Sequence, residues 1–359
     1  MTCSRCEHTT YVEKSALGHT PGTAATCTEN QICTICQAVI TSKLGHSFTN
    51  YTSDNNATCT VDGTKTAKCN RCTNTNTITD VGSAGHKFVN NTCTRCGLES
   101  YNGLVLTLNG NSYSVTDYIG SATSVTIPAT YKGASVTKIG NAAFASCRTL
   151  TRVTIPNTVT ILDSNAFKNC YNLNNIEIPS SVYSIGPEAF YGCESLTSIN
   201  IPDSVTYIQQ AAFKGCRNLK TVTIGNGLDS IPEQAFALCE KLTTVNISNR
   251  VTHIKKAAFS NCSSLKSITI PDSVTTIHDN AFEFCSSLTN ITIGKGVTKI
   301  GKMVFYQTSL TSVKFSDTTT WYMTTSSSYT NGTEVDVTNT ITNTTYFKDT
   351  HRSYYWYKK

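Results

Sequence analysis

The sequence has no long hydrophobic run and carries little charge. A transmembrane helix needs about 20 consecutive apolar residues, and no segment of the 359-residue chain approaches that length, so the sequence predicts no membrane span. Only 14% of the residues are charged, and the net charge of +6 forms no basic stripe, which argues against nucleic acid as a partner. Hydrophobic residues nevertheless make up 39% of the chain, so most of it can bury a core.

Residue clusters suited to catalysis are also missing from the sequence. It shows no nucleophile beside a base, no pair of carboxylates suited to acid–base chemistry and no open metal site, so we expect no enzyme. Cysteine, in contrast, is abundant. Of the 17 cysteines, ten lie in residues 1–96 and seven in residues 147–285. The two groups differ in spacing, and they place a boundary between two architectures near residue 100.

The later cysteines follow one another at a fixed interval of 23 residues, from Cys147 to Cys285. When the sequence is written in rows of 23 residues, these cysteines form one column. Phenylalanine forms a second column, from Phe144 to Phe305, and isoleucine and leucine form others. Residues 196–218 give the pattern of one row, L-x-x-I-x-I-P-x-S-V-x-x-I-x-x-x-A-F-x-x-C-x-x. Rows this short cannot fold alone, so they predict a solenoid in which strands of successive coils stack into parallel ladders.

The I-P step, the A-F pair and the cysteine of each row resemble the BspA-like subclass of leucine-rich repeat proteins, over roughly residues 101–359. The resemblance implies a leucine-rich repeat solenoid of 23-residue coils, with parallel β ladders and short helical turns. It also implies a bacterial cell-surface protein, since members of this subclass are commonly adhesins. We expect a hairpin cap at residues 101–121, the solenoid at 122–315 and a C-terminal cap or tail at 316–359.

The seven column cysteines are expected to pack in the solenoid core, because a free cysteine behaves as a small buried hydrophobe. Their odd number and their parallel side-chain directions argue against systematic disulfide pairing. Aromatic residues gather near the C-terminus and include Trp321, Phe347 and Trp356. They predict a cap over the last coil, with an exposed docking patch as the alternative.

The strand of each row is expected to point alternate side chains outward. These positions hold mostly Ser, Thr and Asn, without the aromatic anchors that dominate protein hot spots. The resulting face is either simply solvated or binds an extracellular protein or a glycan through hydrogen bonds. The candidate ligand-binding residues are Arg152, Thr154, Asn175, Glu177, Asn200, Thr223, Asn246 and Thr269.

Residues 1–100 combine C-x-x-C pairs with a recurrent Gly-His. The unit A-T-C-T…C-x-x-C…G-H supplies three sulfurs and one imidazole, which is the ligand set of a structural zinc site. A module of about 30 residues with few apolar side chains needs such a staple to fold. The pattern predicts small β-rich, zinc-ribbon-like modules. It resembles short repeats found beside leucine-rich and adhesive domains in surface proteins of anaerobic gut bacteria.

Order along the chain leaves the grouping of these ligands open. With the histidine that follows each cysteine triple, the sets are Cys27, Cys33, Cys36, His46 and Cys59, Cys69, Cys72, His86. With the histidine that precedes it, His19 joins the first triple and His46 the second. We favour the first grouping because Cys3, Cys6 and His19 then form a partial unit, although Cys93 and Cys96 remain half a site. Disulfides are the rival interpretation, which gives the histidines no role.

Two functions from different classes are compatible with the sequence. The first is an adhesin-like, surface or secreted protein that binds host or microbial proteins or glycans through the solenoid. The alternative is a structural spacer within a larger surface protein, with no ligand of its own. Residues 1–6 show no export signal, but the sequence begins inside a Cys/His module. We therefore expect a fragment whose signal lies upstream, and an extracellular or cell-surface location.

Overall fold

The computed structural model describes residues 20–35, 37–54, 63–80, 88–89, 92–93, 99–328, 332–350 and 352–359. The chain divides into two compact units, Met1–Leu98 and Glu99–Lys359, which are described separately below. Among the described residues, no helix is long and apolar enough to cross a membrane.

The first unit consists of short antiparallel strands. β1 (Gln31–Ile32) pairs with β2 (Val39–Thr41), β4 (Gly63–Lys68) lies between β3 (Thr52–Ser53) and β5 (Thr75–Asp80), and β6 (Phe88–Val89) pairs with β7 (Thr92–Cys93). Five side chains are buried among the described residues of this unit, namely Cys27, Cys33, Ala67, Cys69 and Cys93. Because four of the five are cysteines, the described part of this unit has no apolar core to stabilise it.

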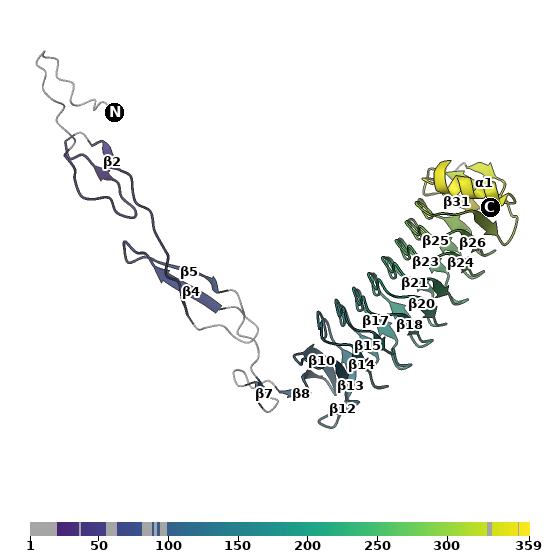
Figure 1. The fold of residues 1–359 in the computed structure, drawn as a ribbon, viewed down its shortest axis with the longest axis horizontal. Helices are drawn as coiled ribbons and strands as arrows, with labels where there is room; N and C mark the ends of the chain where they lie inside the picture. The colour runs from purple at the N-terminus through teal and green to yellow at the C-terminus, as the bar shows by residue number, and fades with distance from the viewer. Residues whose placement is uncertain are drawn as a thin grey trace, which may run out of the picture. The chain divides into compact units, whose positions relative to one another are not determined.

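The second unit is a solenoid whose coils stack side by side (Figure 1). Parallel strands of successive coils form two ladders, the first made of three separately hydrogen-bonded sheets and the second of two. The first ladder contains β11 (Ser124–Thr126), β14 (Arg152–Thr154), β16 (Asn175–Ile176), β18 (Ser198–Ile201), β20 (Thr221–Ile224), β22 (Thr244–Asn246), β24 (Ser267–Ile270), β26 (Asn290–Ile293) and β28 (Ser312–Phe315). The second contains β13 (Ala134–Ile139), β15 (Ile161–Leu162), β17 (Ser184–Ile185), β19 (Tyr207–Ile208), β21 (Ser230–Ile231), β23 (His253–Ile254), β25 (Thr276–Ile277) and β27 (Lys299–Ile300).

The register of the ladders follows the 23-residue period of the sequence. Ile199 lies opposite Val222 in the first ladder, and Ile185 lies opposite Ile208 in the second. Since neighbouring side chains of a strand point to opposite faces, this register places like residues above like and joins the apolar columns into one core. The predicted solenoid of 23-residue coils with parallel ladders is confirmed.

A third side of each coil, around the A-F pair, contains tight turns where the sequence predicts short helical turns. Asn165, Phe167 and Asn169 donate their backbone N–H groups to carbonyls of the next coil, at 2.7–2.9 Å. Two residues of this segment, Asn165 (φ 56°) and Asn169 (φ 58°), have left-handed backbone conformations, as do their equivalents in the other coils. The bonds between coils take the N–H groups that a helix would use internally, and they offset the cost of about 1–2 kcal/mol per left-handed residue.

The phenylalanine column forms a continuous stack through the core. The eight rings from Phe144 to Phe305 are almost fully buried, and successive ring centroids lie 5.1–5.8 Å apart with nearly parallel planes. Each aromatic pair of this kind contributes about 0.5–1.5 kcal/mol beyond the burial of its surface. The stack is therefore a major part of the contact between coils.

Hairpins and aromatic residues cover the two ends of the ladders. At the beginning, β8 (Ser100–Tyr101), β9 (Leu104–Asn109) and β10 (Ser112–Tyr118) form an antiparallel meander, β10 adds to β13 in parallel, and β12 (Thr130–Tyr131) forms a side hairpin with β13. At the other end lie β29 (Trp321–Thr324), β30 (Thr333–Val335), α1 (Thr340–Thr345), the π-helical turn η1 (Tyr346–Thr350) and β31 (Tyr355–Lys358).

The aromatic residues of the C-terminal segment lie over the last coil. β31 pairs with β27 and so continues the second ladder in the antiparallel sense. Phe347 contacts Phe305 edge to face at 5.1 Å and stacks on Trp356 at 4.2 Å. Trp321 and Trp356 are fully buried. This is the arrangement expected of a cap, because it covers the exposed end of the phenylalanine stack.

Candidate metal centre and exposed polar face

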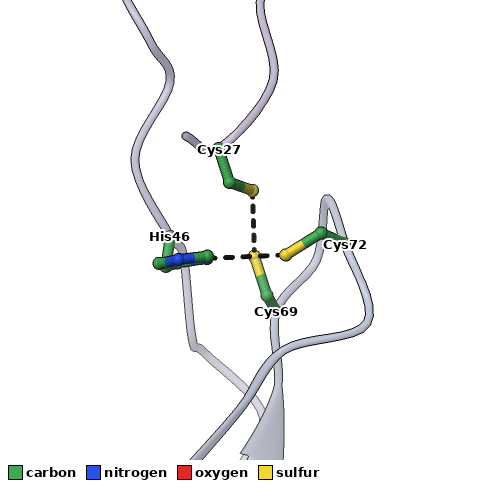
Figure 2. Close-up of side chains that lie close together, drawn as sticks. All are labelled: Cys27, His46, Cys69 and Cys72. Carbon is green, nitrogen blue, oxygen red and sulfur yellow. Dashed lines mark hydrogen bonds between the residues drawn. The ribbon is translucent and has the colours of Figure 1, made fainter. Parts of the chain in front are cut away.

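Four potential metal ligands meet in the first unit (Figure 2). The Sγ atoms of Cys27 and Cys69 are 3.5 Å apart, and Cys72 Sγ lies 3.4 Å from His46 Nδ1. All four ligand atoms lie within 4.8 Å of one another. Two sulfurs bound at about 2.3 Å to a tetrahedral zinc are about 3.8 Å apart, so this cluster has the dimensions to hold a metal ion.

Local hydrogen bonds position Cys27 and His46. The Thr26 side chain accepts hydrogen bonds from the backbone N–H groups of Thr28 and Glu29, which fixes the turn that carries Cys27. The Leu44 N–H donates to the Thr26 carbonyl at 2.8 Å and brings the His46 segment alongside. Gly45, with φ 67°, makes the left-handed bend before His46 that a residue with a side chain adopts only at a cost.

The other two ligands lie in the turn between β4 and β5. The Cys69 N–H donates to the Asn74 carbonyl at 2.8 Å and closes this turn. Arg71, between the two cysteines, donates its guanidinium to the Leu44 and Gly45 carbonyls at 3.0 and 3.3 Å. The turn is therefore attached to the His46 segment by hydrogen bonds that need no metal.

The thiols of the cluster differ in acidity. Desolvation is the largest influence on Cys69 and raises its pKa, but backbone hydrogen bonds from Ser47 and Arg71 outweigh it and lower the pKa of Cys69 to about 5. At Cys27, desolvation and hydrogen bonds to Cys72 and Cys69 raise the pKa to about 12. A thiolate at Cys69 disfavours a second negative charge on the neighbouring Cys27. A cation among them favours the thiolate form of each.

The second nitrogen of His46 also has a partner. His46 Nε2 lies 3.3 Å from the side-chain amide of Asn74. If Nδ1 binds a metal, Nε2 carries the proton and needs an acceptor, which the amide oxygen of Asn74 provides once the amide is turned over. Asn74 is therefore suited to hold the ring in the metal-binding tautomer.

The cluster combines residues that the sequence analysis divided between two sets. Cys27 and His46 come from the first predicted set, whereas Cys69 and Cys72 come from the second. Cys33, in the same predicted set as Cys27, is buried elsewhere in this unit, and Cys93 lies in β7. The other predicted ligands lie outside the described residues, namely Cys3, Cys6, His19, Cys36, Cys59, His86 and Cys96.

The predicted ligand face lies along the first ladder, on the strands from β14 to β24. Along β18, for example, Ser198 and Asn200 are exposed whereas Ile199 and Ile201 are buried. Thr223 is half-buried, and the other seven candidate residues are exposed, namely Arg152, Thr154, Asn175, Glu177, Asn200, Asn246 and Thr269. The predicted outward positions are therefore the accessible ones.

Six of the seven column cysteines, from Cys170 to Cys285, are buried in the core and also form hydrogen bonds that sequence reasoning missed. From Cys170 to Cys285, each thiol donates to the backbone carbonyl of the phenylalanine 26 residues earlier, at 2.9–3.4 Å. Burial raises the pKa of Cys216 to about 12, so this thiol stays protonated at neutral pH. Cys147, the first of the seven, is half-buried against the core, and none of the seven forms a disulfide.

A shallow hollow near the C-terminal cap brings together polar residues that the sequence did not connect. It is lined by His278 and Asp279 of the solenoid, Lys299 of β27 and Tyr355 of β31. Desolvation, followed by the neighbouring His253, lowers the pKa of His278. The two imidazole centroids are 6.0 Å apart. Both the second ladder and the C-terminal cap therefore contribute side chains to this hollow.

Comparison with known proteins identifies the repeat region. The family model described as BspA type leucine rich repeat region (6 copies) matches residues 117–242 and 208–331. A leucine-rich repeat protein from Bacteroides ovatus is 33% identical with a TM-score of 0.56, over 59% of this chain and 57% of that chain. A leucine rich cell surface protein from Faecalibacterium prausnitzii is 30% identical with a TM-score of 0.46, over 60% of this chain and 76% of that chain.

The match to the Bacteroides ovatus protein spans less than two thirds of that protein's length. No curated protein matches the sequence. The two matched ranges together nevertheless cover more than half of the chain, and they coincide with the stacked coils and the phenylalanine column. The protein therefore belongs to the BspA-type leucine-rich repeat family.

Proposed function

We propose that this chain is part of a bacterial surface protein whose solenoid binds an extracellular protein or a glycan through the outer face of the first ladder. One observation carries this proposal. The eight candidate side chains between Arg152 and Thr269 form no hydrogen bond or ion pair with any other described residue. Their donors and acceptors are therefore available to a ligand.

Some threonines next to this face form hydrogen bonds within the solenoid, in contrast to the eight candidate residues. Thr151 and Thr243 lie one position before the exposed residues of their strands, and their hydroxyls donate to a carbonyl of the preceding coil. Thr269 and Thr154 make no such bond. Because ligand recognition by a flat polar surface depends on many hydrogen bonds that exchange with water, a glycan or a polar protein surface suits this face.

For the first unit we propose a structural zinc ion. Three sulfurs and one imidazole fill a tetrahedral shell, so no position is left open for a substrate. The described residues of this unit bury almost no apolar surface, and a metal supplies the stabilisation that a core would otherwise give. The role supported by these side chains is that of a folded module that precedes the solenoid in the sequence, without catalysis.

The binding proposal is tested with the full chain on arrays of extracellular matrix proteins and glycans. The variant Arg152→Ala/Glu177→Ala/Asn200→Ala removes one cation, one anion and one amide from the face. A matched control, Lys255→Ala/Glu233→Ala/Gln210→Ala, removes the same kinds of group from exposed positions outside the first ladder. We expect the first variant to lose binding by tenfold or more and the control to retain it.

The spacer function makes the opposite prediction. If the chain only extends a larger surface protein, no protein or glycan on the arrays binds it above background. Equal losses in the two triple variants would place the ligand elsewhere on the solenoid and contradict the choice of face.

A further inference from the structure

After two of the Gly-His pairs in the first unit, the next residue is hydrogen-bonded to the C-x-x-C turn that follows in the sequence. Thr20, the residue after His19, accepts a backbone hydrogen bond from Thr34 at 3.0 Å. Ser47, the residue after His46, accepts one from Asn70 at 3.0 Å. In both cases the donor is the residue that follows the first cysteine of the pair.

The third module shows the same relation through its strand register. Phe88, two residues after His86 in the sequence, pairs with Cys93 in β6 and β7. In the first module, Pro21 holds the equivalent position after His19 and forms a β-bridge with Cys33. The described residues that follow Gly-His therefore lie next to the downstream C-x-x-C in all three cases.

The C-x-x-C turns themselves are equivalent. The Cys33 N–H donates to the Ala38 carbonyl and the Cys69 N–H to the Asn74 carbonyl, each five residues on and each at 2.8 Å. Cys33 therefore holds the same position in its turn as Cys69 does in the observed cluster. It is a counterpart of Cys69 in the preceding module and not a fourth partner of Cys27.

We infer that the metal sites of the first unit interleave along the sequence. Each site combines a leading cysteine and the histidine after it with the C-x-x-C pair of the next module. The leading cysteine of the following site therefore lies between that histidine and that pair in the sequence.

The observed cluster shows which C-x-x-C pair goes with which leading cysteine and histidine, and we call this correspondence the register of the sites. The observed set is Cys27, His46, Cys69 and Cys72. The same register, applied to the sequence order alone, groups Cys59 with His86, Cys93 and Cys96, of which Cys59, His86 and Cys96 lie outside the described residues. The register gives a place to the pair Cys93/Cys96, which the favoured grouping by sequence order left as half a site.

Interleaving makes each metal ion a link between successive modules. Cys27 precedes the β1–β2 hairpin, His46 follows it, and Cys69 and Cys72 come from the next module. An ion bound there cross-links two modules whose described residues bury almost no apolar side chain. Each bound ion would then link two modules that follow one another in the sequence.

This inference rests on the zinc proposal, and the test separates the two. Zinc per chain is measured by elemental analysis of the full protein and of two double variants. Cys27→Ser/Cys72→Ser removes two ligands of one interleaved site and should lose one zinc ion. Cys59→Ser/Cys72→Ser removes one ligand from each of two sites and should lose two.

Sets that follow the sequence order reverse these expectations, because Cys59 and Cys72 then share a site and Cys27 and Cys72 do not. That reversal, or equal losses in the two variants, overturns the interleaving while leaving zinc binding intact. A parent chain that binds no zinc contradicts the zinc proposal itself.

Discussion

The two groups of cysteines show how the surroundings of a thiol decide its role. In the first unit, Cys27 and Cys69 are buried mainly against one another and against polar backbone, with no apolar core around them. In the solenoid, Cys216 lies inside a continuous hydrophobic core and donates its proton to the Phe190 carbonyl. A thiol that packs stays protonated, whereas a thiol that binds metal must be able to lose its proton. Burial alone therefore does not distinguish the two roles.

Removal of metal should separate the two units most strongly. With a zinc chelator, we expect the first unit to lose nearly all protection of its backbone amides, since its stability comes from the bound ion. The coils of the solenoid should keep their protection, because their core contains no metal ligand set. Hydrogen exchange with mass spectrometry measures both units in one experiment. Unchanged protection of residues 20–80 after chelation would show that the first unit does not depend on a bound metal ion.

Truncation of one ring in the phenylalanine stack should be the largest single effect within the solenoid. Phe213→Ala leaves a cavity between two neighbouring rings and should lower the free energy of unfolding by about 3–5 kcal/mol. Thr269→Ala, on the exposed face, is the control and should change it by less than about 0.5 kcal/mol. Urea unfolding followed by circular dichroism gives both values. Equal effects would mean that the stack does not hold the coils together.

Replacing one cysteine from each group sharpens the contrast directly. Cys216→Ala removes a buried sulfur and its hydrogen bond, and should cost about 1–2 kcal/mol of solenoid stability with zinc content unchanged. Cys72→Ala should reduce zinc by one ion per chain and leave the unfolding of the solenoid unaltered. Elemental analysis and urea unfolding of both variants provide the four readings. Zinc loss in Cys216→Ala would contradict the division of roles.

Ion pairs should contribute least. Desolvation raises the pKa of Asp317, but its hydrogen bond and charge interaction with Lys358 outweigh this and hold the pKa below its usual range. A carboxylate with a lowered folded-state pKa stabilises the protein above its unfolded pKa of about 3.9, and the contribution is lost as the pH falls through the folded value. Asp317→Asn should therefore cost less than about 1 kcal/mol at pH 7.

Urea unfolding of this variant and of the parent, at pH 7 and near pH 2, checks the sign. The difference between them should disappear in acid. A difference that grows as the pH falls would show that Asp317 acts through something other than its charge.

The solenoid could be predicted from the sequence because its information is periodic. A column such as Phe144 to Phe305 fixes the length of a coil, the residues that face inward and the parallel register all at once. Local details were not predictable in the same way. The left-handed residues at positions such as Asn165 come from bonds between coils, and the thiol bonds to phenylalanine carbonyls depend on the path of the backbone, which has no side-chain signature.

The candidate metal centre was predictable in its residue types but not in its grouping. Three cysteines and a histidine identify the chemistry, yet Cys27 and Cys69 are 42 positions apart and Cys33 lies between them in sequence. Sequence order favours neighbouring ligands, whereas the backbone pairs the segment after His46 with the C-x-x-C turn downstream. The hydrogen bond between Asn70 and Ser47 is the signal for this pairing, and only the folded chain shows it.

The division of roles between the two groups of cysteines is tested most directly by mapping thiol alkylation in the full native chain, with and without a zinc chelator. The account predicts that Cys27, Cys69 and Cys72 are protected with zinc and react after chelation, while the buried ladder cysteines from Cys170 to Cys285 stay unmodified in both conditions. Reaction of the ladder cysteines in the native chain, or a first unit whose cysteines stay unreactive after chelation, would contradict it.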